Sequence, residues 1–398
     1  MKPVKTIRDP IHGTIVLSEL ELELIDTPQL QRLRHIKQNG LCYLIYPAMN
    51  STRFEHSLGV MQLAKLAGEH LGLDDDETIK LGIAGLLHDI GHCAFSHTSD
   101  EILLRMGHHH EENSSHIIEN TEISDILGKN GIEPKDVSDL IHGRGNLAKV
   151  ISSEIDVDKM DYLIRDAYYA GVAYGVIDLE RIIYGMKIVD GDMVIERRSL
   201  EAVESLLISR NMMYQTVYRH HTKRIAEAMF RHALVDMMDN KKLSYEEFIQ
   251  LDDIDLVYRM RSSGGYSEEI TRRIDERKLF KIVFQEHISA IEENFREDMN
   301  DSSTKIEDAI AKDFGIEKGY VLLDMPETKL SEFKVLVDFE GELKRIDEVS
   351  SLAKSLEKSE QEKMTFCIYA PKKETEKFKK FNPEKYIEFS QTRLAKFV

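Results

Sequence analysis

The sequence predicts a mainly α-helical protein with short β-hairpins and a small α+β lobe at its C-terminal end. Apolar residues recur at helical spacing through most of the first 315 residues, and side chains suited to helix caps precede several of these segments. After residue 320 the apolar runs become short and rich in β-formers. We therefore expect a largely helical domain over residues 1–315 and a small α+β lobe over residues 316–398.

The composition is that of a folded globular protein in a reducing compartment. Of 398 residues, 42% are hydrophobic and 31% charged, and no apolar run reaches membrane-spanning length. The N-terminal residues lack the apolar core of a signal peptide, and Cys42, Cys93 and Cys367 form no CxxC pair. We expect a cytoplasmic protein without a membrane partner. The formal charge of −18 disfavours nucleic acid as the main partner, because such binding draws on clustered positive charge.

The chain is expected to begin with a hairpin and a helix. Residues 5–17 have the pattern of two short strands around a Pro-Gly turn. The helix starts at Asp26-Thr27-Pro28, where a side-chain cap precedes proline in the first turn, and it ends near Gly40. The polar face of this helix, which includes Gln31 and Arg34, is expected to face solvent.

Two further helices bring histidines to their ends. Residues 53–71 form the first, and Arg53 and His56 lie on the same side of it because they are three residues apart. The second is capped by Asp74–Asp76 and ends at His88-Asp89, before Gly91.

A helix over residues 156–169 carries a polar stripe. Asp158, Tyr162 and Asp166 are four residues apart, and the neighbouring positions are apolar. The stripe predicts either a polar pocket or a solvated face, and the pattern alone leaves both open.

The remaining segments follow from turn and cap signals. A hairpin is expected around Asp190-Gly191, and a helix over about 200–239 aligns Arg210, Tyr214 and Tyr218. A capping box at Ser244–Glu247 opens helices that continue to about Phe314. The C-terminal lobe is expected to contain strands at 321–323, 334–339 and 365–369 and a helix at 350–358.

Four side chains from three predicted helices form a candidate metal site: His56, His88, Asp89 and Asp158. Two imidazoles and two carboxylates leave coordination positions open on a divalent ion such as Mn or Fe, as hydrolysis requires. The alternative for His88-Asp89 alone is a helix end at which Asp89 pairs with an arginine.

Six sequence blocks resemble a known family: Asp9-Pro-Ile-His-Gly13, Asp26-Thr-Pro-Gln-Leu-Gln-Arg-Leu-Arg34, Arg53-Phe-Glu-His-Ser-Leu-Gly59, His88-Asp-Ile-Gly-His92, Phe95-Ser-His97 and Asp156-Val-Asp-Lys-Met-Asp-Tyr162. With the H…HD…D pattern, they are similar to the HD-domain metal phosphohydrolases, most closely to the SAM-and-HD-domain dNTP triphosphohydrolases and their prokaryotic relatives. The resemblance covers about residues 5–235, and we expect no SAM domain before Lys5. It implies an HD-domain helical core.

The resemblance also implies a reaction, the hydrolysis of a dNTP to deoxynucleoside and triphosphate with Mn, Fe, Mg or Zn as the divalent metal. The residues that match substrate-binding positions are Gln38, Asn39, Arg53, Lys159, Tyr162, Asp166, Arg210 and Tyr218. Among them, Arg210 and Tyr218 match a pair that grips the γ-phosphate and packs against the deoxyribose. Asn39 departs from the family, whose SAM-domain members have leucine there.

Five residues match positions near the reacting phosphate. His97 matches a candidate general acid for the 5′-oxygen, and His92 a residue close to the α-phosphate. Asp100 and His110 match a pair that orients the attacking water, and Glu111 follows them. An imidazole that titrates near neutral pH suits either proton role.

A guanine-nucleotide activator pocket is the last feature that the resemblance implies. It comprises Lys5, Asp26, Gln31 and Arg34. Arg181 and Arg198 are candidates for a second activator site. GTP, dGTP or another dNTP would be the activator, and assembly into a homotetramer or dimer is expected because such sites lie between subunits.

Two other functions use the same residues differently. An HD-type phosphodiesterase or nuclease would need the metal site but not the Arg210/Tyr218 pair. A non-catalytic dNTP sensor would not need the proton-transfer groups His97 and His110. Product analysis separates all three.

Overall fold

The computed structural model describes residues 3–105, 107, 110–326 and 334–390, and only the backbone of His97, Glu101, Arg105, His110, Glu111, Asp298, Asn300, Asp301 and Gln361. Two compact units are each assembled from separate stretches of the chain. The first comprises Met1–Tyr218, Tyr245–Leu256 and Leu330–Glu357, and the second comprises Arg219–Ser244, Val257–Lys329 and Lys358–Val398. The expected domain boundary near residue 315 stays a prediction.

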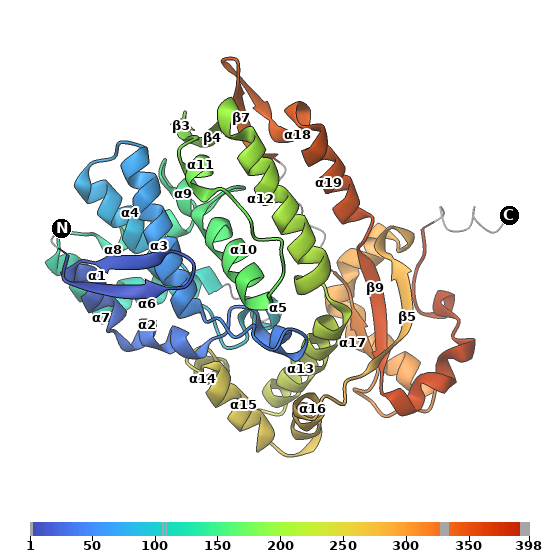
Figure 1. Ribbon diagram of the computed structural model, residues 1–398. Coiled ribbons are helices and arrows are strands. Elements are labelled where there is room, and N and C mark those ends of the chain that lie inside the picture. The colour runs from blue at the N-terminus through green and yellow to red at the C-terminus, as the bar shows by residue number, and fades with distance from the viewer. Residues whose placement is uncertain (1–2, 106, 108–109, 327–333, 391–398) are drawn as a thin grey trace. The chain divides into compact units, whose positions relative to one another are not determined.

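The first unit is built on a row of four helices (Figure 1). Helix α3 (Arg53–His70) packs against α4 (Asp75–Leu87) and α10 (Val157–Ala170), and α12 (Leu200–Met213) packs against α10. Their inward faces bury leucine, isoleucine and alanine side chains, which confirms the mainly α prediction. No helix in the described ranges is long and apolar enough to cross a membrane.

Shorter helices surround this row. They are α1 (Glu19–Ile25), α2 (Pro28–Arg32), α5 (Ser96–Arg105), α6 (His110–Asn120), α7 (Glu122–Lys129), α8 (Pro134–Ile141), α9 (Ala148–Ile151), α11 (Leu179–Ile183), α14 (Tyr245–Phe248) and α18 (Ile346–Val349). Two more, α15 (Asp253–Arg261) and α19 (Ser351–Gln361), begin in the first unit and end in the second.

The two expected hairpins are present. Strands β1 (Lys5–Asp9) and β2 (Gly13–Leu17) form one, and β3 (Met186–Val189) and β4 (Asp192–Glu196) form the other. A later hairpin, β7 (Leu336–Phe339) with β8 (Glu342–Arg345), joins the second in the order β3-β4-β7-β8, and β4 and β7 are parallel. The strand expected at 334–339 therefore extends the β3–β4 hairpin of the first unit.

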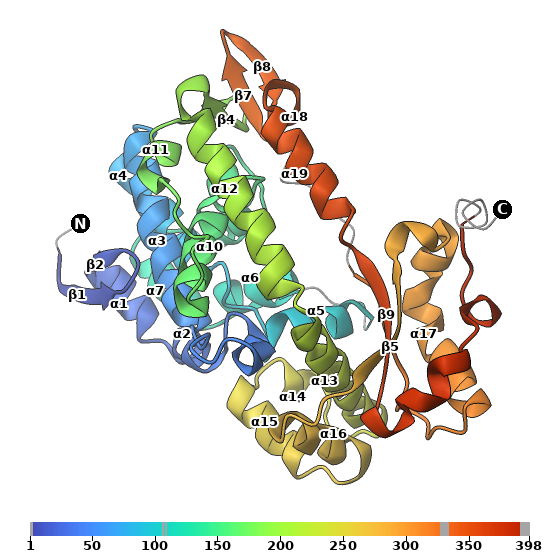
Figure 2. The same ribbon diagram turned by 45° about the vertical axis from the view of Figure 1, so that its right-hand side comes forward.

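The second unit combines three helices with an antiparallel sheet (Figure 2). Its helices are α13 (His221–Asp239), α16 (Gly265–Asp275) and α17 (Glu293–Asp313). The sheet has the order β5-β9-β6, formed by Lys281–His287, Thr365–Ala370 and Leu322–Asp324. Phe230, Phe280 and Phe366 are buried in this unit.

The helix that starts at Pro28 is shorter than predicted. It ends at Arg32 and is followed by a 3-10 turn, because the next residues pair with a distant segment. The N–H of Gln38 donates to the Ser51 carbonyl, and the N–H of Arg53 donates to the Ile36 carbonyl. The N–H of Lys37 donates to Asp253 Oδ2 at 3.0 Å. Gln38 and Asn39 consequently lie in a turn rather than in a helix.

Two other predicted helical stretches were wrong in part. The helix expected over 200–239 is interrupted by a π-helical segment, Tyr214–Tyr218, and by extended backbone at His220, which caps α13. The stretch expected to stay helical to Phe314 contains strand β5, which pairs with β9 more than 75 residues later. Its partner could not be inferred from local pattern.

Candidate metal centre and nucleotide site

Three side chains from three helical segments converge. His56 lies at the start of α3, His88 directly follows α4, and Asp158 lies at the start of α10. The Nε2 atoms of the two histidines are 3.2 Å apart. Asp158 Oδ1 lies 2.9 Å from His56 Nε2 and 3.7 Å from His88 Nε2. The ligand atoms all lie within 4.8 Å of one another, so these residues can hold one metal ion.

Hydrogen bonds on the opposite ring nitrogens fix both imidazoles. His88 Nδ1 donates to the Gly85 carbonyl at 2.8 Å, and His56 Nδ1 donates to Asp161 Oδ2 at 2.8 Å. A carbonyl or carboxylate oxygen can only accept, so the proton lies on Nδ1 and Nε2 is directed at the cluster. This arrangement is the usual support of a metal-binding histidine.

The charges of the cluster also suit a cation. Burial would lower the pKa of His56, but hydrogen bonds with Asp158 and Asp161 raise it to about 10. Burial would raise the pKa of Asp158, but His56 and His88 hold it well below its usual range. The carboxylate thus stays ionised, and without a metal ion the protonated His56 neutralises it; an ion bound at His56 Nε2 would displace that proton. The Asp158 side chain is 32% exposed, which leaves one side of the cluster open.

Asp89 lies beside the cluster and is shared with an arginine. Its Oδ2 accepts from Arg53 Nη1 at 2.5 Å, and its Oδ1 is 3.3 Å from His88 Nε2 and 3.2 Å from His92 Nε2. Burial would raise the pKa of Asp89, but Arg53, His88 and His92 hold it well below its usual range. The pairing of Asp89 with an arginine is therefore observed, and its position beside His88 is compatible with a metal ligand. Its role as a fourth ligand stays a prediction.

Helix α10 continues from the metal cluster into the predicted nucleotide site. It carries Lys159, Tyr162 and Asp166 after Asp158. Tyr162 packs edge-on against Tyr218, whose hydroxyl donates to Asp166 Oδ2 at 2.7 Å. Burial raises the pKa of Asp166 to about 6, against the effect of hydrogen bonds with Asn39 and Tyr218. The Tyr162 and Asp166 end of the stripe predicted on this helix is therefore enclosed by other side chains rather than solvated.

Basic side chains at this site differ in how they are held. Lys159 Nζ donates to Asp156 Oδ2 at 2.8 Å and to the Ser153 carbonyl at 2.9 Å. The Arg210 guanidinium lies over the Tyr214 ring, 4.2 Å from its centroid, and is buried. Arg53 Nε donates to Ser96 Oγ at 2.8 Å.

Several buried polar atoms lack a protein partner among the described residues, and they include Nη2 of Arg53 and Oε1 of Gln38 at this site. A buried donor or acceptor without a partner costs free energy, so such atoms indicate where a ligand group binds.

The predicted catalytic residues are described only in part. His92 Nε2 contacts Asp89 Oδ1 at 3.2 Å, and His92 Nδ1 lies 3.7 Å from Asp100 Oδ1. Burial and the charge of Arg53 act to lower the pKa of His92, but Asp89 and Asp100 act to raise it. The net effect is a raised pKa. The side chains of His97, His110 and Glu111 lie outside the described part of the structure.

Comparisons with known proteins agree with this arrangement. The HD domain model matches residues 53–166, and the HD associated region model matches residues 177–397. The chain belongs to the HD-domain phosphohydrolases. The HD domain spans the whole metal cluster, from His56 to Asp158, and this membership supports hydrolase activity.

Individual relatives extend the comparison. An uncharacterized protein of Methanocaldococcus jannaschii is 36% identical over 95% of this chain and 82% of its own length. The deoxynucleoside triphosphate triphosphohydrolase SAMHD1 homolog of Dictyostelium discoideum is 31% identical over 71% of this chain, which spans 60% of that protein. The crystal structure of a phosphohydrolase from Bacteroides thetaiotaomicron is 25% identical, covers 93% of this chain and 100% of its own, and superposes with a TM-score of 0.76.

The predicted activator residues lie at the edge of this HD fold. Gln31 Nε2 donates to the Ile25 carbonyl at 2.8 Å, next to exposed Asp26, and Arg34 Nε donates to Gln31 Oε1 at 2.8 Å. Lys5 is exposed on β1. Their role stays a prediction. For the second candidate site, Arg181 Nη2 donates to the Arg198 carbonyl at 2.7 Å.

A buried network of ionic hydrogen bonds lies on the Nδ1 side of His56, and the sequence analysis assigned it no role. His12 Nε2 lies 2.5 Å from Asp161 Oδ1, Arg165 Nε donates to Asp161 Oδ2 at 2.8 Å, and Arg165 Nη1 donates to Asp9 Oδ2 at 2.8 Å. All four residues are almost fully enclosed. The i, i+4 spacing of Asp161 and Arg165 was the available signal.

Proposed function

We propose that this protein hydrolyses dNTPs to deoxynucleosides and triphosphate in a metal-dependent reaction. The observation that carries the proposal is the course of α10, which begins with Asp158 in the metal cluster and reaches Asp166 beside Tyr218. A phosphate bound at one end and a sugar at the other would match this layout. The named activity of the Dictyostelium relative agrees with it.

The chain supplies cationic donors for the phosphates. When bound by His56, His88, Asp158 and Asp89, a Mn, Fe, Mg or Zn ion neutralises phosphate charge and lowers the pKa of water. Arg53, Lys159 and Arg210 donate to phosphate oxygens, and the buried Nη2 of Arg53 gains its missing acceptor.

Proton transfer belongs to the segment that follows α4. In this proposal His97 protonates the departing 5′-oxygen, while Asp100 and His110, followed by Glu111, orient the attacking water. His92 lies next to Asp89 and donates toward the α-phosphate.

The sugar pocket explains a preference for deoxyribose. Tyr218 is held by its hydrogen bond to Asp166 and by edge contacts with Tyr162 and Tyr214. A ring fixed against C2′ leaves no space for a 2′-hydroxyl, and Gln38 Oε1 accepts the 3′-hydroxyl. Asn39 would alter contacts near the sugar or base relative to leucine.

Activation is part of the proposal. Lys5, Asp26, Gln31 and Arg34 bind GTP, dGTP or another dNTP between subunits, so that the activator promotes a homotetramer or dimer. If neither turnover nor oligomer size responds to these nucleotides, the activator role is excluded while hydrolysis stands.

One assay tests the reaction. The full chain is incubated with Mn²⁺ and each dNTP, and products are separated by chromatography. Deoxynucleoside plus triphosphate is the expected pair, absent in the Asp158→Asn variant. A monophosphate product or cleavage of nucleic acid would indicate a phosphodiesterase or nuclease instead, and binding without product would indicate a sensor.

A further inference from the structure

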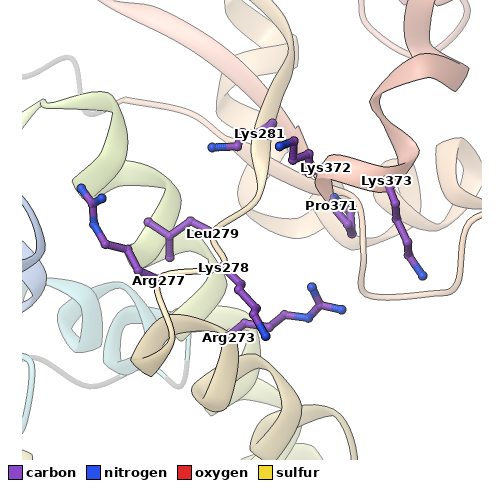
Figure 3. Close-up of a pocket in the computed structure, with 8 residues that line it drawn as sticks. All are labelled: Arg273, Arg277, Lys278, Leu279, Lys281, Pro371, Lys372 and Lys373. Carbon is purple, nitrogen blue, oxygen red and sulfur yellow. The ribbon is translucent and has the colours of Figure 1, made fainter.

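One buried charge of the first unit takes no part in the reaction proposed above. It is the carboxylate of Asp253, at the start of α15, and the residue is only 5% exposed. The basic cavity of the second unit, shown in Figure 3, is different, because most of the Lys and Arg side chains that line it are exposed. An exposed charge keeps its water, whereas a buried carboxylate is costly unless donors satisfy it. The position of Asp253 therefore calls for an explanation.

Backbone N–H groups from two distant segments satisfy this carboxylate. Its Oδ1 accepts from the N–H of Phe95 at 2.8 Å, and its Oδ2 accepts from the N–H of Lys37 at 3.0 Å. In the described part of the chain, no Lys or Arg nitrogen lies within 4.0 Å of either oxygen. Asp253 thus joins two stretches of backbone, and it does so without a counter-ion.

Each of these segments continues into the nucleotide site. The first leads into Gln38, whose buried Oε1 lacks a protein partner among the described residues. The second leads into Ser96, whose Oγ accepts from Arg53 Nε at 2.8 Å, and then into His97. The two oxygens of one carboxylate therefore tie the segment proposed to bind the sugar to the segment proposed to act on the phosphate.

The backbone of Phe95 depends on this support. Its φ is 51°, in the left-handed region, where a bulky side chain is an outlier. Its carbonyl accepts the N–H of Thr98 at 2.8 Å, so Phe95 begins the turn that enters α5. The hydrogen bond to Asp253 stabilises this direction of the N–H. Backbone strain of this kind is found at functional sites, where the surrounding structure holds it in place.

Arg32 ties the same stretch of α14–α15 to the turn that follows the metal ligand His88. Its Nη1 donates to the Leu251 carbonyl at 3.0 Å. Its Nη2 donates to the carbonyls of Ile90 and His92, at 3.2 Å and 2.7 Å. Residues 251–253 are therefore connected to both ends of the segment that runs from the metal centre to α5.

We propose that Asp253 is a positioning residue of the hydrolytic site, which holds the turn at Gln38 and the segment at Ser96 in their relative places through the N–H groups of Lys37 and Phe95. It lies in the part of the chain that matches the HD associated region, whereas Phe95 lies in the HD domain. The effect on turnover rests on the proposed function, but the restraint on the two segments does not depend on the substrate.

The cost of this carboxylate supports a role other than stability. Burial raises the pKa of Asp253 to about 6, so the ionised form is disfavoured in the folded chain above that pH. A group that is retained against such a cost is typical of sites at which stability and activity conflict.

Steady-state hydrolysis of dNTPs with Mn²⁺ by the full chain tests the role in turnover. In Asp253→Asn the amide offers one acceptor oxygen and turns an NH₂ group toward the other backbone N–H, so one of the two bonds is lost. We expect kcat/KM to fall about 10- to 100-fold, because small displacements of reacting groups have effects of this size. Mn²⁺ affinity should stay as in the wild type, since Asp253 contacts none of His56, His88 and Asp158.

Leu256→Ala is the matched control for a merely structural effect. Leu256 is fully buried in the same helix, and its side chain makes no hydrogen bond. The control should be less stable in urea and yet keep the kcat/KM of the wild type at a temperature at which both are folded. An equal loss of kcat/KM in the two variants, or none in Asp253→Asn, would overturn the proposal.

Hydrogen–deuterium exchange of the metal-free chain tests the restraint without any substrate. In Asp253→Asn, the peptide that contains Lys37 or the one that contains Phe95 should exchange at least about tenfold faster, with no change in peptides of α12. Unchanged exchange, or a gain of the same size in α12, would overturn the restraint. If the wild type hydrolysed no dNTP, the proposed function would fail, and faster exchange confined to these peptides would still support the restraint.

Discussion

Asp161 accepts the Nδ1–H of His56 at 2.8 Å, and this contact joins the metal cluster to a buried ionic network. The same carboxylate contacts His12 and Arg165, and Arg165 reaches Asp9 in the N-terminal hairpin. Desolvation of so many charges is tolerated because each is paired. Asp161 therefore orients a metal ligand without being one.

Replacing Asp161 with asparagine is expected to weaken metal binding by about 10- to 100-fold, the usual effect of losing such support. Titration with Mn²⁺, followed by electron paramagnetic resonance of the free ion, measures the change. Asp192→Asn, at an exposed carboxylate of β4, is the matched control and should bind like the wild type. Unchanged Mn²⁺ affinity of Asp161→Asn would exclude this role.

Gly59 is required for the close approach of α3 and α10. A Cβ at this position would lie 1.9 Å from Asp161 Oδ1 and 2.6 Å from Arg165 Nη2. We expect Gly59→Ala to destabilise the fold by about 1–3 kcal/mol through overpacking. At Gly128, a helical glycine of α7 with open space around it, the same change should stabilise by about 0.5–1 kcal/mol. Urea unfolding measures the free energy of unfolding of both variants. Equal changes in Gly59→Ala and Gly128→Ala would refute the packing argument.

The helices that carry the metal ligands were predictable because their signals are local. Apolar periodicity predicted helices over residues 53–71 and 156–169, and the aspartate cap predicted the start of α4. These helices carry or end at His56, His88 and Asp158, so the sequence predicted that the three side chains meet. They do converge. The role of Asp161 could not be predicted, since its partner His12 lies 149 residues away in sequence and Arg165 links it to equally distant Asp9.

Long-range pairing also explains the errors in secondary structure. The sequence of strand β5 has no local signal that separates it from the helices around it, and among the described residues its strand partner is β9. Helix α2 stops where the chain pairs with residues 51–53 and with Asp253. The helix predicted over 200–239 is interrupted at Tyr214–Tyr218, and Tyr218 donates a hydrogen bond to Asp166. The prediction of one continuous helix did not include this contact.

Asp253 predicts a pH dependence of stability. Its Oδ1 accepts the Phe95 N–H at 2.8 Å and its Oδ2 accepts the Lys37 N–H at 3.0 Å, and burial raises its pKa to about 6. The folded protein therefore binds this proton more tightly than the unfolded chain does. The stabilisation from this group is complete below a pH of about 4 and is lost as the pH rises through about 6, by about 3 kcal/mol in total.

Asp253→Asn removes this titration. Relative to the wild type, the free energy of unfolding of the variant should increase between about pH 4 and about pH 6 and level off above that. Urea unfolding across this range measures it. Asp255→Asn, at an exposed position of α15, should give a curve parallel to the wild type. Parallel curves for Asp253→Asn would contradict the raised pKa.

Metal binding should stabilise the folded chain. An ion that binds the cluster of the native state alone adds about 2.7 kcal/mol of stability at a hundred times its dissociation constant. We expect Mn²⁺ to raise the Tm of the wild type, measured by calorimetry, and EDTA to reverse the change. His88→Gln should abolish the response, because it removes the Nε2 that lies 3.2 Å from that of His56. His116→Gln, on an exposed face of α6, should keep it, so a Mn²⁺ response that survives in His88→Gln would place the ion elsewhere.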